Sequence, residues 1–101
     1  MSLLLKDPSL LREAALIGGE WLPAAGRAAL DVFDPATGAP VGVVPDCTAA
    51  ETEAAIAAAS AAWPGWRART ANERSGLLER WHALVLDNLD DLARIMTAEQ
   101  G

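Results

Sequence analysis

The chain offers one thiol and one imidazole for covalent or acid–base chemistry. Cys47 lies between Asp46 and Thr48, and the N-terminus of the helix expected there would favour its thiolate. A nucleophilic thiol also needs a base and a group that stabilises an oxyanion, and the lone His82 lies far along the chain. We therefore expect Cys47 to be non-catalytic and His82 to be an ordinary surface or boundary histidine.

The short motifs that mark catalytic or phosphate-binding centres are missing from the sequence. It contains no G-x-G-x-x-G or Walker-type phosphate loop, no G-x-S-x-G elbow, no H-E-x-x-H pair and no second cysteine. The acidic residues are scattered over predicted helix caps and faces, where a capping or solvated role is the favoured interpretation. We accordingly assign no catalytic, no cofactor-binding and no metal-binding residue within residues 1–101.

Composition indicates one small acidic unit. The 101 residues include 14 acidic and 8 basic ones, for a net charge of −6 without a basic cluster, which argues against nucleic-acid binding. A single cysteine excludes an internal disulfide and fits a reducing compartment. The apolar run Leu3-Leu4-Leu5 stops at Lys6 and is too short for a signal peptide or a membrane span. We expect a cytoplasmic location and no membrane partner.

The C-terminal half carries repeated helix signals. Thr48-Ala-Ala-Glu51 and Thr70-Ala-Asn-Glu73 both have the pattern of a capping box, in which the Thr hydroxyl and the Glu carboxylate each accept from a backbone N–H. Trp63-Pro-Gly-Trp66 predicts a stop between them, because proline removes a donor and restricts the preceding residue. We predict helices over about 49–62, 71–87 and 89–99. Asn88 is expected to cap the third, and Asp90 and Arg94 to pair within it.

The second predicted helix has a strongly apolar face, formed by Leu77, Leu78, Trp81, Leu84 and Val85. Three of the four tryptophans lie in the helical half of the chain, so a Trp-lined contact surface is one interpretation. Core packing is the favoured one, because Trp suits half-buried helix faces.

Residues of about 15–45 predict two short β-hairpins. Gly18-Gly19 supplies the positive φ angles of a two-residue turn, and Pro35-Ala-Thr-Gly38 supplies the turn of a second hairpin. Pro8 is expected early in a short helical turn. The fold class is therefore α+β, with two short β-hairpins followed by two to three helices. Isolated hairpins are marginal in water, so these strands need the helices or a partner.

Several segments, taken in order, resemble the N-terminal region of aldehyde dehydrogenases. They are Ile17-Gly-Gly-Glu-Trp21, Asp31-Val-Phe-Asp-Pro-Ala-Thr-Gly38, Val43-Val-Pro45, the Ala-rich helix leading into Trp63-Pro-Gly-Trp66, Glu73-Arg74, Leu77-Leu78 and Met96-Thr-Ala-Glu-Gln-Gly101. Within that family, three further segments look most like bacterial succinate-semialdehyde dehydrogenase: Leu11-Arg-Glu-Ala-Ala-Leu16, Arg80-Trp81 and Asp90-Asp-Leu-Ala-Arg94.

The resemblance implies that residues 1–101 are the N-terminal portion of the cofactor-binding domain of an α/β aldehyde dehydrogenase fold. The parent enzyme would use NAD or NADP to oxidise succinate semialdehyde to succinate through a thiolate nucleophile. In the family, the nucleophile, the general base and the cofactor contacts lie beyond the point where this chain stops. The piece alone is therefore expected to be an inactive scaffold without bound cofactor. Its expected partners are the remainder of the enzyme chain and, in the parent, a homodimer or homotetramer.

Two alternatives stay open. The chain could be a free-standing α+β module whose Trp and Leu face binds a protein partner, or it could belong to another aldehyde dehydrogenase subfamily, such as one acting on betaine or aromatic aldehydes. If it is part of a larger enzyme, Trp81 and its leucine neighbours should be left exposed by this chain alone.

Overall fold

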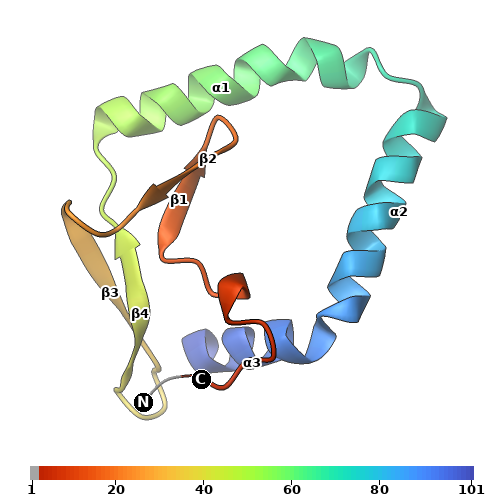
Figure 1. Ribbon diagram of the computed structural model, residues 1–101. Helices are drawn as coiled ribbons and strands as arrows, with labels where there is room; N and C mark the ends of the chain where they lie inside the picture. The colour runs from red at the N-terminus through yellow and green to blue at the C-terminus, as the bar shows by residue number, and fades with distance from the viewer. Residues whose placement is uncertain (1–2) are drawn as a thin grey trace.

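The computed structural model describes residues 3–101 as two β-hairpins followed by three helices, arranged as an open ring (Figure 1). The three long helices and the second hairpin form the sides of the ring, and in this view the first hairpin lies inside its outline. This arrangement confirms the α+β fold class. In chain order the elements are the short helix η1 (Pro8–Leu10), β1 (Ala14–Ile17), β2 (Glu20–Pro23), β3 (Ala29–Phe33), β4 (Pro40–Pro45), α1 (Ala49–Arg67), α2 (Ala71–Asp87) and α3 (Leu89–Gln100).

The predicted glycine pair forms the turn of the first hairpin. Strands β1 and β2 are antiparallel, and Ile17 lies opposite Glu20. Gly18 and Gly19 have φ angles of 60° and 79°, which are left-handed values that favour glycine over other residues. Two positive φ angles in a two-residue loop match the twist of the flanking strands.

Asp34 organises the turn of the second hairpin. Its Oδ1 accepts from the Ala36 N–H at 2.8 Å, and its carbonyl accepts from the Gly38 N–H at 2.7 Å. Aspartate commonly organises turns in this way, since its side chain replaces a backbone acceptor. The two hairpins are joined by Glu13, whose carboxylate accepts from the Val43 N–H at 2.8 Å.

Helix α1 begins with the predicted capping box. Thr48 Oγ1 accepts from the Glu51 N–H at 3.2 Å, and Glu51 Oε1 accepts from the Thr48 N–H at 3.0 Å. Arg27 Nη1 also contacts Glu51 Oε2 at 2.7 Å. The backbone hydrogen bond from Thr48 lowers the pKa of Glu51, and the Thr48 hydroxyl and the Arg27 charge act in the same direction.

The predicted end of this helix, at residue 62 before Trp63-Pro-Gly-Trp66, was wrong. Helix α1 runs through Pro64 to Arg67. Proline forfeits the one hydrogen bond that its own N–H would donate, and the alanine-rich turns before it have high helix propensity. The Pro64 carbonyl still accepts from the Ala68 N–H at 3.2 Å, so the last turn stays closed.

Asn88 and its neighbours also differ from expectation. Asn88 Nδ2 donates to the Leu84 carbonyl at 2.8 Å, so its side chain terminates α2 and does not cap α3. Asp90 pairs with Lys6 at 3.2 Å, and Arg94 Nη1 instead reaches the Leu4 carbonyl at 3.5 Å. Asp90 and Arg94 therefore contact the N-terminal segment and not each other, because that segment lies against α3.

The cap of α2 agrees with the prediction only in part. Thr70 Oγ1 accepts from the Glu73 N–H at 3.2 Å, as in a capping box. Glu73 Oε1, however, accepts from the Thr70 hydroxyl at 3.1 Å and not from the Thr70 backbone. One of the two expected backbone donors is therefore satisfied.

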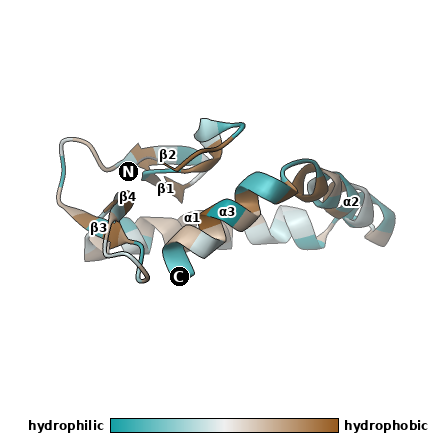
Figure 2. Ribbon diagram, turned by 90° about the horizontal axis from the view of Figure 1, so that it is seen from below, coloured by the Kyte–Doolittle hydropathy of each residue, from teal (hydrophilic) through white to brown (hydrophobic). Residues whose placement is uncertain are grey.

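The ring encloses almost no core. The radius of gyration is 16.5 Å, against about 13 Å for a compact chain of this length. The accessible surface is 7552 Å², whereas a compact monomer of this mass exposes about 5,500 Å². Ala24 is the one hydrophobic residue classed as buried among residues 3–101. Figure 2 shows α2 extending beyond the hairpins, without a strand over it.

Candidate functional site

The residues with potential for covalent or acid–base chemistry are dispersed. Cys47 is a half-buried free thiol in the connection between β4 and α1. His82 belongs to α2, and the start of α1 and the middle of α2 lie on opposite sides of the ring (Figure 1). Within residues 3–101, no three His, Cys, Asp or Glu side chains gather as metal ligands would. Cys47 and His82 therefore lie apart in the described structure.

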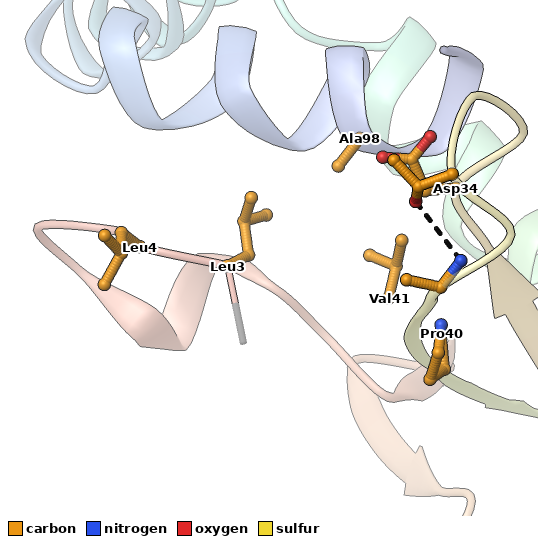
Figure 3. A pocket seen from close by; sticks show the side chains of 8 residues that line it. Leu3, Leu4, Asp34, Pro40, Val41 and Ala98 are labelled. Carbon is orange, nitrogen blue, oxygen red and sulfur yellow. Dashed lines mark hydrogen bonds between the residues drawn. The ribbon is translucent and has the colours of Figure 1, made fainter. Parts of the chain in front are cut away.

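A hollow of about 430 Å³ lies between the N-terminal segment, the β3–β4 turn and the end of α3 (Figure 3). Leu3 faces Val41 across it. Two of its polar atoms accept hydrogen bonds within the turn: Asp34 Oδ1 from the Ala36 N–H, and Thr37 Oγ1 from the Ala39 N–H at 3.2 Å. The charged group in its lining is the carboxylate of Asp34, and a carboxylate repels the phosphates of a nicotinamide cofactor. Its lining suits apolar packing.

The N-terminal segment is held on α3 by a buried carboxylate. Asp91 is 3% exposed and accepts from the Lys6 N–H at 2.9 Å and from the Asp7 N–H at 2.8 Å. These two backbone hydrogen bonds lower the pKa of Asp91, with smaller contributions from the charges of Lys6 and Arg94. The contact joins the two ends of the chain and closes the ring.

An exposed apolar surface lies on one side of α2; it is formed by Leu78, Trp81, Leu84 and Val85 and is called here the α2 face. Trp81 is 66% exposed and Leu84 is 60% exposed. Among the described elements, only the neighbouring helix α3 makes more than marginal contact with α2. These findings confirm the expectation that this chain leaves Trp81 and its leucine neighbours uncovered.

Three of the four tryptophans depart from the favoured interpretation of core packing, and the fourth, Trp66, is half-buried. Trp21, Trp63 and Trp81 are all exposed within this chain. Exposed aromatic and leucine side chains on one helix face mark a protein-interaction surface more often than a solvated one. The α2 face is therefore the candidate functional site, and what it can do is bind other protein residues.

Sequence reasoning missed a charged group at the edge of this face. Arg74 lies on the same side of α2, and its Nε is shielded from solvent and has no hydrogen-bond partner among residues 3–101. It helps to line a hollow with Trp66, Ser75, Leu78, Glu79 and His82. Helical periodicity does place Arg74 there, because it lies four positions before Leu78 and seven before Trp81 and so shares their side of the helix.

A bilayer-crossing segment is not found in the described part of the chain. None of the helices of residues 3–101 combines the length and the apolar character that a membrane span requires.

Comparisons with known proteins agree with the resemblance noted in the sequence. A model described as the aldehyde dehydrogenase family matches residues 21–101. The glutarate-semialdehyde dehydrogenase of Pseudomonas putida is 54% identical over 97 residues, and the NADP(+) succinate-semialdehyde dehydrogenase of Escherichia coli is 53% identical over the same length. Each match covers 96% of this chain and 20% of the relative.

The folds agree as well. The crystal structure of a succinate-semialdehyde dehydrogenase from Burkholderia pseudomallei superposes with a TM-score of 0.86 at 58% identity. The match covers 93% of this chain and 20% of that one, so the chain spans about a fifth of the length of the proteins that it matches. The ring of hairpins and helices is thus the conformation that these residues share with larger folded proteins.

Proposed function

Because this chain belongs to the aldehyde dehydrogenase family, we propose that it acts as the N-terminal part of an NAD(P)-dependent enzyme that oxidises succinate semialdehyde to succinate. The observation that carries this proposal is identity of about half, over nearly the whole chain, to semialdehyde dehydrogenases. In this proposal the residues described here contribute structure and no reacting group.

The proposed role of these residues is to cover a cofactor-binding domain of Rossmann-like fold. The α2 face supports this role, since Trp81 and Leu84 are exposed here and apolar helix faces of this kind pack against other layers. NAD or NADP would be held by residues outside this segment and would accept the hydride. A homodimeric or homotetrameric assembly and a cytoplasmic location stay predictions from the resemblance.

The proposed substrate is a short aldehyde with a carboxylate at its far end. The two bacterial relatives are named for glutarate semialdehyde and succinate semialdehyde, which share both groups and differ by one methylene. A single methylene is worth only about 1–3 kcal/mol in a hydrophobic pocket, so overlap between these two substrates is expected. We favour succinate semialdehyde because of the segments around Arg80-Trp81 and Asp90–Arg94.

The test is an assay of the full-length protein that contains this chain. NAD(P)H formation would be followed with succinate semialdehyde, glutarate semialdehyde, betaine aldehyde and benzaldehyde, with NAD and NADP in turn. The expected result is the highest kcat/KM with succinate semialdehyde, and no turnover by the 101-residue chain alone. Preference for a neutral or cationic aldehyde, or turnover by the isolated chain, would contradict the proposal.

The second candidate function is a free-standing module that uses the α2 face to bind a protein partner. The same exposure of Trp81 and Leu84 supports it. The two functions differ in whether the chain is stable on its own, because a module must fold without the missing layer.

A further inference from the structure

Arg74 presents a buried donor without an acceptor. It lies in the first turns of α2, and its backbone N–H donates to the Thr70 carbonyl at 3.1 Å. Its side-chain Nε is the one buried side-chain nitrogen or oxygen within residues 3–101 that lacks a hydrogen-bond partner. Buried polar groups in folded proteins are nearly always paired, so an acceptor is missing from this surface.

Nearby carboxylates do not supply that acceptor. Glu73 Oε1 accepts from the Thr70 hydroxyl at 3.1 Å and serves the helix cap. Glu79 follows five positions later, which places it roughly 140° around the helix from Arg74. The ion pairs found in the described part of the chain are Lys6–Asp90 and Arg27–Glu51. None of these carboxylates accepts from Arg74 Nε within residues 3–101.

The chemistry of guanidinium specifies the kind of acceptor. When another layer covers the α2 face, the rest of the Arg74 side chain loses its water as well. A buried positive charge without a counter-charge is strongly unfavourable, and a carbonyl would satisfy the N–H without balancing that charge. The planar edge formed by Nε and one Nη matches the two oxygens of a carboxylate.

We propose that Arg74 is the polar anchor of the α2 face, and that it binds an Asp or Glu carboxylate of the segment of the same enzyme chain that covers this face. The inference rests on the proposed function, since that function supplies the covering residues. The ring as a whole exposes about 2,000 Å² more than a compact monomer of its mass, so it needs a covering layer. The matched proteins are about five times as long as the aligned segment, which leaves ample chain to provide this cover.

The test uses the full-length enzyme and three variants. Arg74→Met keeps an apolar stem without donors, Arg74→Lys keeps the charge without the planar fork, and Arg80→Met is the matched control at an exposed position of the same helix. We expect Arg74→Met to lower the apparent melting temperature by about 5 °C or more, with a smaller loss for Arg74→Lys. Arg80→Met should change it by about 1 °C at most.

A crystal structure of the unmodified full-length enzyme provides a second measurement that does not depend on variants folding. It should show a carboxylate oxygen of the same chain within hydrogen-bond distance of Arg74 Nε. A main-chain carbonyl, a water molecule or a second copy in that place would overturn the proposal, and so would equal effects of Arg74→Met and Arg80→Met. If the enzyme oxidises succinate semialdehyde while Arg74 shows no such partner, the anchor is wrong and the proposed function stands. If the carboxylate is present but no aldehyde is oxidised, the proposed function is wrong and the anchor stands.

Discussion

The 101-residue chain, produced without any further residues, is predicted not to unfold as a cooperative unit. The perturbation is the absence of the layer that the α2 face would contact. Local structure should persist in part, because the Gly18-Gly19 turn and the Thr48 cap depend on neighbouring residues. Tertiary order should not persist, since Ala24 is the one hydrophobic residue classed as buried in the described part of the chain.

The loss of hydrophobic stabilisation can be calculated from the exposed surface. The chain exposes 7552 Å², about 2,000 Å² more than a compact monomer of its mass. If a little over half of that excess is apolar, roughly 1,100 Å² lacks cover. At about 25 cal/mol per Å² the missing burial is worth ~28 kcal/mol, whereas whole domains are stable by only about 5–15 kcal/mol. The shortfall exceeds anything that caps and turns can offset.

Calorimetry and circular dichroism would check this prediction. We expect a broad or absent calorimetric transition, retained far-ultraviolet signal, weak near-ultraviolet signal from the tryptophans, and binding of a hydrophobic dye. Concentration-dependent association is also expected, since the α2 face is apolar. A sharp, reversible and concentration-independent transition would refute the reasoning and favour the free-standing module.

Two substitutions in the full-length enzyme test local parts of the account. Gly18→Ala should destabilise the first hairpin by about 1–2 kcal/mol in thermal or denaturant unfolding, because φ is 60° there while an added Cβ would meet Ala58 at an ordinary 3.8 Å. Gly65→Ala is its control, being helical with open space around it, and should be neutral or stabilising. Asp91→Asn should weaken the protection of the Lys6 and Asp7 amides in hydrogen exchange, with Asp90→Asn as the control. Folding lowers the pKa of Asp91, so its contribution to stability is present above the ordinary carboxyl range and is lost as pH falls through the pKa of the folded state. Acid should therefore speed exchange of the Lys6 and Asp7 amides in the unmodified enzyme. It should have little further effect in Asp91→Asn.

The features that could be predicted from the sequence are those decided by neighbouring residues. The turn at Gly18-Gly19 requires positive φ angles, and the turn after Asp34 requires a side chain that replaces a backbone acceptor. The capping box of Thr48 and Glu51 closes within one helical turn. Each of these needs no knowledge of the distant chain, so the spacing of residue types was sufficient.

The features that were missed depend on distant partners. Asp91 accepts from the backbone N–H groups of Asp7 and Lys6, which lie 84 and 85 positions earlier. Asp90 forms an ion pair with Lys6 and not with Arg94. No periodic pattern contains such a pairing. Arg74 is a different case, because it lies four positions before Leu78 and helical periodicity was sufficient to place it on the α2 face.

The tryptophans show where composition misleads. Their size and apolar character favour core packing. Composition alone does not say whether that core is formed by this chain or together with other residues. Trp21, Trp63 and Trp81 are exposed within residues 3–101, so the favoured interpretation of core packing fails for these three within this chain. Under the proposed function, another layer of the enzyme covers them.

The most direct test of that proposal is the solvent accessibility of Trp81 in the full-length enzyme, measured by oxidative footprinting against the isolated chain. Trp81 is 66% exposed in the chain described here. The account predicts that Trp81 is strongly protected from oxidation in the enzyme and reacts readily in the isolated chain. Equal oxidation of Trp81 in both would contradict the claim that the α2 face is covered by the rest of an aldehyde dehydrogenase.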